Sequence, residues 1–471
     1  MVTSEGLADV SPAVLTARLD RIPTLTRKHI GLVALLISLF VFDIVDLSAL
    51  SFVAPALREQ WGLTLEELGL LTSTAFIGMF LGGLIGGRLA DRFGRKPILL
   101  VGVVLFSLAS IASAFAPNAE VLGVLRFILG FGLQMTTGAV LVIVSESFPK
   151  AFRGRVMASV LGISLIGTPL IALVALALVP RGMWSGVFCI GGLGLVPALL
   201  AIKLLPESPR WLALNGRVAE ADAQLRIYEA EYTAKHGILP VLEVQSAVPL
   251  VDSMSTVVDI LKPKLIRRTV VATLVFCGFI LINYGFSTWL PIILVERGYP
   301  QSDALTFSFV LSFAYMAGAL LSTLFIDRVE RKFTIATAIG LAAICYLTVG
   351  LIDSVPVLLV AGFAANMLTQ VVLATIYSYV PELFPVQVRG IGAGFANGTA
   401  RFAGIFSGII VAAVLAAFAV EGVFVYLALV ALAMAAIVLF GPGTGVRDAH
   451  RAQRAAKEVV HSETAGTALE V

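Results

Sequence analysis

Four charged side chains lie deep inside apolar runs of the sequence. Asp43 and Asp46 lie in a run that begins near Ile30, and Arg126 and Arg401 lie in two later runs. A charge at the centre of a bilayer costs about 2.5 to 3.5 kcal/mol on insertion scales, so all four should face a protein interior. A carboxylate can take up and release a proton, whereas an arginine stays charged and offers a fork of donors to another carboxylate. The four residues therefore predict a site that handles protons and anions.

The two acids are the predicted proton carriers. Asp43 and Asp46 are three residues apart, which places them on one helix face. Two neighbouring carboxyl groups tend to share one proton, because two negative charges close together repel each other. None of the four histidines lies in an apolar run, so a proton carrier there must be a carboxylate. We expect Asp46, with Asp43 as its neighbour, to be protonated and Arg126 to pair with Asp46; the alternative is a purely structural Asp46–Arg126 pair.

Arg401 is the predicted binding residue for the negative charge of a substrate, since its guanidinium can hold a carboxylate with two hydrogen bonds. The alternative is that Arg401 only balances a buried acid. Further polar and aromatic residues in the runs could supply hydrogen bonds and a flat wall, although packing is the alternative for each: Gln134, Asn283, Tyr284, Trp289, Gln370, Tyr377 and Asn397.

The elements that must position these residues are membrane helices. Of the 471 residues, 58% are hydrophobic and 13% are charged, whereas soluble domains carry about 25% charged residues. Runs long enough to span a bilayer, which takes about 20 residues, recur twelve times. The sequence predicts an all-α polytopic membrane protein with spans at 30–56, 67–88, 97–115, 119–147, 156–178, 184–205, 269–294, 303–326, 333–352, 356–382, 390–417 and 421–441.

The basic residues predict the topology. Outer loops hold only Arg58, Arg181 and Arg297 of the 33 Lys and Arg, if the chain starts inside. Cytoplasmic loops are enriched in Lys and Arg, so both termini are expected in the cytoplasm and the protein in the plasma membrane. The net charge of +3 reflects this bias and is weak evidence for nucleic-acid binding. The expected parts are a tail at 1–29, six-helix bundles at 30–205 and 269–441, a linker at 206–268 with a helix near 219–232, and a tail at 442–471.

Two motifs occur twice. DRFGRK at 91–96 matches DRVERK at 327–332, and ESFPKAFRG at 146–154 matches ELFPVQVRG at 382–390, with the same displacement. A shared displacement indicates a duplicated six-helix unit and two pseudo-symmetric bundles. None of the four deep charges meets a charged residue under that displacement. Substrate chemistry is therefore expected where the symmetry is broken.

GRLADRFGRKPIL, at 87–99, resembles the signature of the major facilitator superfamily. PESPRWL and the two E-x-F-P-x-x-x-R-G segments resemble the branch of sugar porters and organic-ion transporters. FDIVDLSALSFVAPAL with NYGFSTWLP looks most like aromatic-acid and niacin-type proton symporters. The resemblance implies uptake of a small organic anion, such as an aromatic or heteroaromatic monocarboxylate, with protons by alternating access. It also gives Asp46 the position of a coupling aspartate and gives Arg401, in FANGTAR, that of an anion-binding arginine.

The resemblance further implies a cytoplasmic gate, in which Asp91 contacts the start of the eleventh span near Arg389 and a charge network breaks on inward opening. A basic loop that only sets topology is the alternative. In the second and eleventh spans, glycines at spacing four, at 78, 82 and 86 and at 390, 394 and 398, are expected to form a seam between the halves. The gate residues are Asp91, Arg92, Gly94, Arg95, Glu146, Arg153, Glu207, Arg210, Asp327, Arg331, Glu382 and Arg389.

Other functions remain open at this point. Proton-driven efflux is an alternative, although the fifth span has only Gly162, Gly167 and Pro169 of a Gly-Pro signature. Sugar:proton symport is a second alternative, although the seventh span lacks the paired glutamines that sugar porters present to sugar hydroxyls. A non-transporting receptor or scaffold is a third alternative. The spans show no nucleophile–base pair or metal cluster, and the chain has no nucleotide-binding P-loop, so we expect no enzyme, no metal and no cofactor beyond the proton as coupling ion. The expected partners are the anion, protons and the lipid bilayer, without nucleic acid, and the expected state is a monomer.

Overall fold

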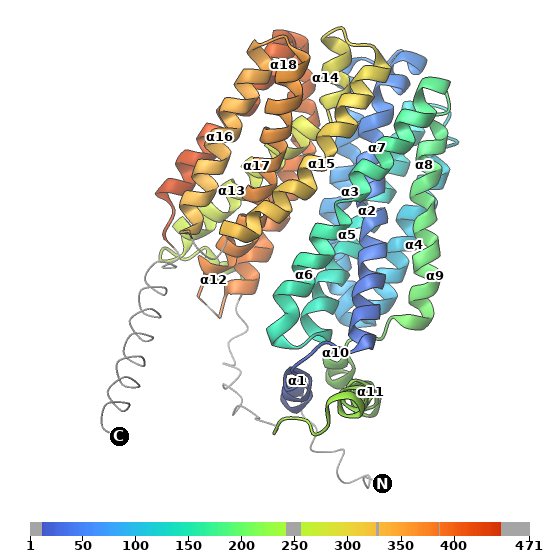
Figure 1. Cartoon of the computed structure of the whole chain (residues 1–471), viewed down its shortest axis with the longest axis vertical. Coiled ribbons are helices and arrows are strands. Elements are labelled where there is room, and N and C mark those ends of the chain that lie inside the picture. Colours follow the sequence, from blue (N-terminus) through green and yellow to red (C-terminus); the bar gives the residue numbers. More distant parts are fainter. Residues whose placement is uncertain (1–11, 242–255, 326–328, 386, 444–471) are drawn as a thin grey trace, which may run out of the picture. The chain divides into compact units, whose positions relative to one another are not determined.

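The computed structural model describes residues 12–241, 256–325, 329–385 and 387–443, which form helices and no β-strand (Figure 1). Eleven helical segments of this part of the chain are long and apolar enough to cross a membrane. They comprise α2 (Arg27–Trp61), α3 (Leu65–Phe93), α4 (Arg95–Ser113), α5 (Ala119–Ser147), α6 with α7 (Lys150–Ser164, Gly167–Leu178), α8 with α9 (Ser185–Gly191, Leu195–Leu204), α13 (Ile266–Ser287), α15 (Gln301–Phe325), α16 (Arg331–Leu351), α17 (Val355–Glu382) and α18 (Arg389–Phe440).

The last of these segments contains two spans. At about 1.5 Å per residue, the 52 residues of α18 would extend roughly 78 Å, which is more than twice the hydrocarbon thickness of about 30 Å. Ala419, with φ of 55° and ψ of −163°, interrupts the helix. This break lies in the predicted gap between 417 and 421. The all-α fold with twelve membrane spans is therefore confirmed.

The chain forms two compact units. Unit 1 consists of Met1–Met254, Tyr284–Phe313 and Arg401–Val420, and unit 2 consists of Ser255–Asn283, Ala314–Ala400 and Glu421–Val471. Unit 1 thus includes short segments from the second half of the sequence, among them α14 (Leu290–Glu296). The predicted boundaries of the two six-helix bundles stay a prediction.

Glycines bring α3, α4 and α5 into backbone contact in unit 1. A Cβ atom built on Gly78 would lie 2.0 Å from the Phe127 carbonyl oxygen of α5, and one on Gly130 would lie 2.0 Å from the Ala75 carbonyl oxygen of α3. A Cβ atom built on Gly102 of α4 would lie 2.8 Å from the Gly132 carbonyl oxygen of α5. A side chain at these positions would force the helices apart, which explains why small residues form the contact.

The predicted glycine seam between the halves is wrong for the second span, because its glycines are occupied by α5. A Cβ on Gly82 would lie 2.4 Å from the Phe131 carbonyl oxygen, and one on Gly86 would lie 2.8 Å from the Met135 side chain. In the eleventh span, Cβ atoms on the three predicted glycines would meet no atom within 4 Å: Gly390, Gly394 and Gly398. Spacing alone indicated a close-packing face but could not say which helix covers it.

A close contact between α3 and α18 does exist within unit 1, at other residues. A Cβ on Gly408 would lie 2.1 Å from Thr72 Oγ1, and one on Gly404 would lie 2.5 Å from the Phe76 ring. The Ser73 hydroxyl donates to the main-chain oxygen of Ile405 at 2.5 Å. The 401–420 segment is thus packed against the first half of α3.

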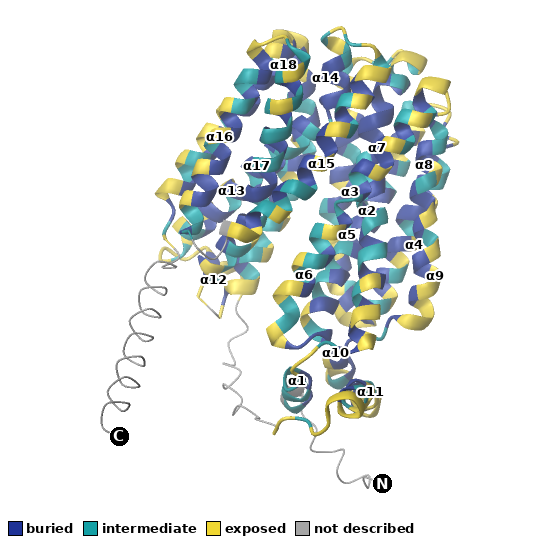
Figure 2. Cartoon of the chain, viewed as in Figure 1, coloured by how far each residue is buried: buried dark blue, intermediate teal, exposed yellow. Residues whose placement is uncertain are grey.

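The apolar core of unit 1 lies between α2, α4, α5 and α9. Leu36, Leu99, Phe106 and Leu133 are all fully buried there. Large apolar residues on the same helices are also exposed, among them Val104, Val124 and Leu199, and Figure 2 shows exposed positions along these helices. Outward apolar side chains are expected for helices in lipid, because the bilayer rather than water covers them.

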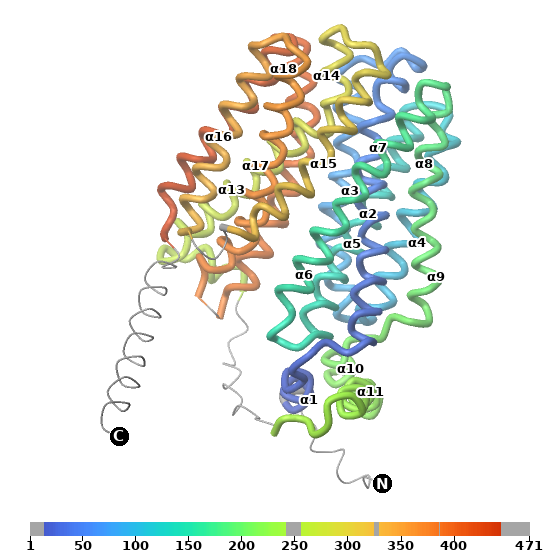
Figure 3. Tube along the Cα trace, viewed as in Figure 1, coloured from blue at the N-terminus to red at the C-terminus, as the bar shows by residue number. Residues whose placement is uncertain are grey.

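Three short helices gather at one end of unit 1: α1 (Pro12–Asp20), α10 (Pro209–Leu214) and α11 (Val218–His236) (Figure 3). They share an apolar cluster that contains Leu15, Leu19 and Leu225. α11 confirms the helix predicted near 219–232, whereas α1 lies in a tail for which no helix was predicted. The α1 helix is the part of unit 1 that hydropathy gave no reason to expect.

Unit 2 contains α12 (Val257–Ile260), most of α13, the C-terminal part of α15, α16, α17 and the two ends of α18. α16 packs along α17, where the Tyr346 hydroxyl and Thr369 Oγ1 are 3.1 Å apart. The Tyr379 hydroxyl donates to the main-chain oxygen of Pro442 at 3.1 Å and so fixes the end of α17 to the residues after α18. Unit 2 therefore has its own polar cross-links between helices.

Candidate functional site

The four deep charges all belong to unit 1. Asp43 and Asp46 of α2 are 3% and 0% exposed, and Arg126 of α5 is 1% exposed. Arg401 of α18 is half-buried. The expectation that these charges face a protein interior is met for Asp43, Asp46 and Arg126, which are buried.

Asp46 lies where α2 meets α4 and α8. One carboxylate oxygen, Oδ1, contacts the Ser110 hydroxyl of α4, and the other, Oδ2, has no hydrogen-bond partner. A Cβ on Gly191, where α8 ends, would lie 1.7 Å from Asp46 Oδ1. Only glycine leaves room for the carboxyl group, so the backbone of α8 forms one wall of this site.

Arg126 contacts Asp46 in a way that differs from the predicted ion pair. Its Nη1 donates to the main-chain oxygen of Asp46 at 3.1 Å, and its guanidinium carbon lies 4.4 Å from the centre of the Phe188 ring. Among the described residues, the Arg126 guanidinium forms no ion pair with a carboxylate; its Nε and Nη2 have no hydrogen-bond partner. The sequence correctly predicted that Arg126 lies beside Asp46, but a main-chain carbonyl occupies the contact in place of the carboxylate.

Asp43 faces a different set of groups. The Thr137 hydroxyl of α5 donates to Asp43 Oδ2 at 3.2 Å. Arg401 lies near enough for its positive charge to act on the Asp43 carboxylate. The structure therefore associates the predicted anion-binding arginine with Asp43, while Arg126 is associated with Asp46.

The remaining predicted substrate contacts are divided between the units. Tyr284 stacks edge-on against Phe76, with ring centres 4.7 Å apart, and Trp289 is 1% exposed with its indole N–H unpaired. Gln134 lies on α5, with Oε1 unpaired, three residues before Thr137. These residues belong to unit 1, whereas the others belong to unit 2: Asn283, Gln370, Tyr377 and Asn397.

In unit 2, Gln370 is buried and its Oε1 has no hydrogen-bond partner. Tyr377 lies edge-on to Phe276, with ring centres 5.6 Å apart, and is 39% exposed. Asn283 and Asn397 are half-buried. Their roles as substrate contacts stay a prediction.

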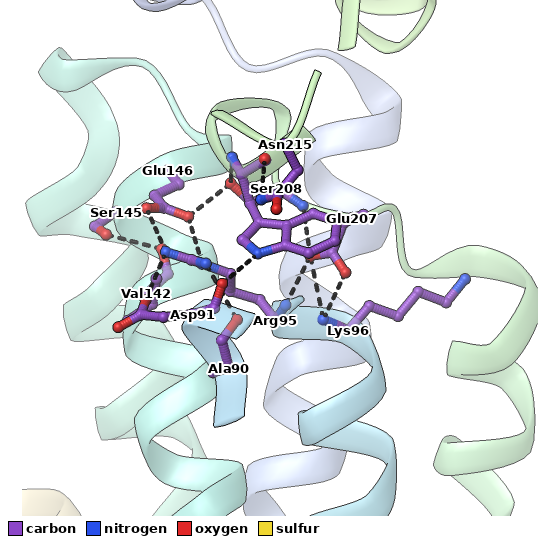
Figure 4. A network of polar contacts seen from close by, with 11 residues as sticks. Ala90, Asp91, Arg95, Lys96, Val142, Ser145, Glu146, Glu207, Ser208 and Asn215 are labelled. Carbon is purple, nitrogen blue, oxygen red and sulfur yellow. Dashed lines mark hydrogen bonds and ion pairs between the residues drawn. The ribbon is translucent and has the colours of Figure 1, made fainter. Parts of the chain in front are cut away.

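The repeated motif at the end of α3 forms a polar network with α5 and the linker (Figure 4). Arg95 Nε donates to Glu146 Oε2 at 3.0 Å, and its Nη2 lies 3.1 Å from Asp91 Oδ1. Glu207 Oε1 accepts from the main-chain N–H of Arg95 at 2.9 Å and that of Lys96 at 3.2 Å. Since the first N–H groups of a helix lack partners within it, the Glu207 carboxylate caps α4.

Gly94 makes this arrangement possible. Its φ is 105°, which side chains rarely adopt, and a Cβ there would lie 2.3 Å from Glu207 Oε2. The predicted tight turn after the second span is therefore present. Ser208 completes the network by donating to Glu146 Oε2 at 2.6 Å, so the linker is joined to the ends of α3 and α5.

Other predicted gate residues lie elsewhere. Arg153 pairs with Asp20 of α1 at 3.0 Å, an interaction that the sequence did not suggest. Arg92 lies over the Phe93 ring, and the exposed Arg210 has no ion pair among the described residues. The predicted contact between Asp91 and Arg389 joins different units and stays a prediction.

The second copy of the motif repeats the central ion pair. In unit 2, Arg331 pairs with Glu382, and these two residues match Arg95 and Glu146 in the duplicated motifs. Arg389 is close enough for its charge to act on Glu382. Asp327 lies outside the described residues. An arginine–glutamate pair between two helices is thus a feature that the two units share, at positions that are equivalent in the duplicated motifs.

Sequence reasoning missed several residues that contact the deep charges: Ser110, Thr137, Phe188 and Gly191. They are small, neutral or apolar, and each is common in membrane helices. The glycine cluster at 191–194 was the available signal, because glycines in a span indicate close approach of another chain segment.

A cavity of about 420 Å³ lies where the C-terminal end of α2 meets α14. Pro55, Leu63 and Ile292 contribute apolar walls, and Arg58 and Gln301 contribute polar groups. Arg58 also pairs with Glu296 of α14. None of the residues that line this cavity is one of the four deep charges, so the cavity is separate from the charged site.

Comparisons with known proteins identify the family. The Major Facilitator Superfamily model matches residues 35–408 and 308–465. A putative metabolite transport protein of Bacillus subtilis is 33% identical, covering 91% of this chain and 96% of its own. The niacin transporter NiaP of Acinetobacter baylyi is 32% identical, covering 90% and 96%. A partially occluded inward-open structure of the xylose transporter XylE from E. coli matches the fold with a TM-score of 0.68 at 18% identity, covering 88% of this chain and 99% of XylE. The chain belongs to the Major Facilitator Superfamily.

Proposed function

We propose that this protein imports a small organic anion, an aromatic or heteroaromatic monocarboxylate, together with protons by alternating access. Its similarity to a niacin transporter supports this substrate class, because niacin is a heteroaromatic monocarboxylate. The buried carboxylates of α2 and the arginine of α18 support the coupling of an anion to a proton.

The observation that supports the proposal is that a buried carboxylate, Asp43 of α2, and an arginine, Arg401 of α18, belong to the same compact unit, with the arginine near enough for its charge to act on the carboxylate. While Asp43 is ionised, its carboxylate competes with a substrate carboxylate for the arginine. Protonation of Asp43 removes this competitor and strengthens the attraction of Arg401 for the incoming anion. Deprotonation restores the competition and weakens anion binding. One proton and one anion are therefore favoured on the protein at the same time, which is the requirement for symport.

Asp46 has a second role in this scheme. The Asp46 side chain is fully buried beside Ser110, and Arg126 donates to the main-chain oxygen of Asp46. An ionised Asp46 would need new partners, and the two unpaired nitrogens of Arg126 are nearby donors. Its protonation is therefore expected to alter the packing of α2 against α4 and α8.

The orientation follows from the basic residues. We assign the end of unit 1 that carries α1, α10 and α11 to the cytoplasm, with both termini on that side of the plasma membrane. The Arg95–Glu146 and Arg331–Glu382 pairs are then at cytoplasmic helix ends, where pairs of charges suit a gate that opens and closes. The protein acts as a monomer in this scheme.

Uptake by the reconstituted full chain tests the proposal. In proteoliposomes with an acidic exterior, radiolabelled nicotinate should accumulate, and benzoate or 4-hydroxybenzoate should compete, whereas xylose and tetraethylammonium should not. Arg401→Ala should weaken nicotinate binding by about 10- to 150-fold, since a hydrogen bond to a charged group contributes about 1.5 to 3 kcal/mol. Arg181→Ala, which alters an exposed arginine that bonds only within its own turn, is the matched control. Unchanged affinity in Arg401→Ala would show that this arginine only balances Asp43.

Asp46→Asn separates the coupling step from exchange. The variant should lose accumulation driven by the pH gradient but keep counterflow of labelled for unlabelled substrate. Accumulation that survives in the variant would exclude Asp46 as the coupling residue. In vesicles of known orientation, net movement of substrate from the cytoplasmic to the outer face under a pH gradient would indicate efflux. Nicotinate binding without any transport would indicate a receptor.

A further inference from the structure

The Ser110 hydroxyl lies within hydrogen-bond distance of two oxygen atoms but has only one hydrogen to donate. Its Oγ lies 2.8 Å from the main-chain oxygen of Phe188 and also contacts Asp46 Oδ1. A hydroxyl has one hydrogen to donate, and a main-chain carbonyl can only accept. If Ser110 donates to Phe188, the hydrogen between Ser110 and Asp46 must come from Asp46. This arrangement therefore requires a protonated Asp46.

Arg126 closes a ring of contacts around this hydroxyl. Its guanidinium lies over the Phe188 ring at 4.4 Å, and its Nη1 donates to the Asp46 main-chain oxygen at 3.1 Å. Asp46 Oδ2 and two nitrogens of Arg126 are buried without hydrogen-bond partners. An unpaired buried polar group costs about 1 to 3 kcal/mol, so the ring is poised to rearrange when the charge on Asp46 changes.

The backbone of α8 holds the groups together. α8 ends at Gly191 and continues as a 3-10 turn over Gly192–Gly194. Cβ atoms would lie 2.4 Å from Ser110 Oγ if built on Gly191, and 2.7 Å from Ser107 Oγ if built on Gly194. Since glycine lets α8 approach so closely, movement of the Asp46 carboxyl group cannot occur without affecting α8 or α4.

We propose that Ser110 is a positioning residue that holds the protonated form of Asp46, and that proton release breaks the link from α2 through Ser110 to the Phe188 carbonyl of α8. This inference rests on the proposed proton symport. The charged or titratable groups that face Asp46 are Arg126 from α5 and Asp43 from its own helix. From α4 and α8 it meets Ser110 and Gly191, which do not titrate. Neutral groups from these two helices therefore select between the protonated and ionised forms.

The test compares Ser110→Ala with Ser113→Ala in reconstituted full-length protein. Ser113 lies one turn along α4, is equally buried, and donates only to Ala109 of its own helix at 2.7 Å. Ser110→Ala removes the acceptor that favours protonated Asp46, so half-maximal nicotinate uptake should require about tenfold more acid, a shift of one pH unit. Counterflow at saturating acidity, measured in the same vesicles, shows whether the Ser110→Ala protein is folded and able to exchange substrate. Ser113→Ala should keep the wild-type pH profile.

Two outcomes overturn the proposal in different ways. If wild-type uptake has no pH dependence, proton symport fails and the role of Ser110 fails with it. If wild-type uptake depends on pH but Ser110→Ala has the same midpoint, symport stands and the role of Ser110 is wrong.

Ser110→Cys provides a second variant that conserves shape, and its weak S–H group should shift the midpoint in the same direction. Infrared difference spectra give a readout that does not depend on transport. The carboxylic-acid band that is lost in Asp46→Asn should move to higher frequency in either Ser110 variant, because its hydrogen bond is weakened. An unmoved band contradicts the proposed contact.

Discussion

The carboxylate of Glu229 holds α1 against α11, so Glu229→Gln should release α1. Arg18 donates to both oxygens of Glu229, at 3.0 and 2.7 Å, and Arg21 donates to Oε1 at 2.7 Å. The Arg18 and Glu229 side chains are only 14% and 12% exposed, so water competes weakly for these bonds. Loss of the negative charge should therefore weaken α1 docking more than loss of a surface ion pair would.

The size of the effect follows from these three bonds. A hydrogen bond to a charged group contributes about 1.5 to 3 kcal/mol, and glutamine keeps one neutral acceptor oxygen. We expect a net loss of about 2 to 3 kcal/mol in the free energy of docking α1. Because about 1.4 kcal/mol corresponds to a factor of ten, α1 should open about 30- to 150-fold more often.

Acidification should act in the same direction on the wild type. Burial alone raises the pKa of Glu229, but the hydrogen bonds from Arg18 and Arg21 outweigh it and lower the pKa below its ordinary value. A carboxyl group whose pKa is lowered on folding stabilises the fold above its unfolded pKa, and this contribution is lost as pH falls through the folded pKa. Protection of α1 should therefore decrease below about pH 4, where glutamate ordinarily titrates, and Glu229→Gln should lack this transition.

Hydrogen exchange measured by mass spectrometry checks both expectations, with protection factors for the α1 peptide corrected for the intrinsic effect of pH. Glu220→Gln is the control, because Glu220 pairs with Arg217, the residue that precedes α11, and its side chain is 56% exposed. Equal α1 protection in Glu229→Gln, Glu220→Gln and wild type would refute the assignment of Glu229 as the docking residue.

Three further substitutions test the packing and capping of unit 1. Gly82→Ala should lower the melting temperature in scanning fluorimetry, because its Cβ would lie 2.4 Å from a carbonyl oxygen of α5, whereas Gly138→Ala meets nothing within 4 Å and should not. Glu207→Ala should accelerate exchange of the first α4 amides by about 5- to 30-fold, since a lost helix cap costs about 1 to 2 kcal/mol; unchanged exchange would mean that water replaces the carboxylate. Gly408→Val should lower the yield of folded protein, because its Cβ would lie 2.1 Å from Thr72 Oγ1, and a normal yield would contradict the tight α3–α18 contact.

Hydropathy and charge predicted the spans because they depend on composition along the chain. The gap predicted before residue 421 coincides with the break at Ala419, and the helix predicted near 219–232 is part of α11. The duplicated motifs indicated equivalent positions in the two halves, and the structure places equivalent ion pairs there, Arg95–Glu146 and Arg331–Glu382. Each of these inferences needed only the order of residues.

Side-chain partners between helices were harder to predict, because they depend on how each helix is rotated and how closely its neighbours approach. Gly78, Gly82 and Gly86 share a face as predicted, but α5 covers that face. Arg126 lies beside Asp46 as predicted, but meets its carbonyl oxygen and not its carboxylate. One residue of rotation, or about 1 Å of approach, decides such outcomes, and the sequence of a single chain records neither.

Ala419 has a consequence for how the eleventh and twelfth spans can move. It is the one non-glycine residue with positive φ among those that the structure describes, and it lies two residues before Glu421, where the chain leaves unit 1 for unit 2. Its φ and ψ lie in a region used mainly by glycine, at a cost of about 1 to 3 kcal/mol. The two spans are thus joined by a strained hinge about one residue long. Ala419→Gly should relieve this strain and raise the melting temperature, even though glycine ordinarily weakens a helix, while it loosens the one backbone joint between the two spans.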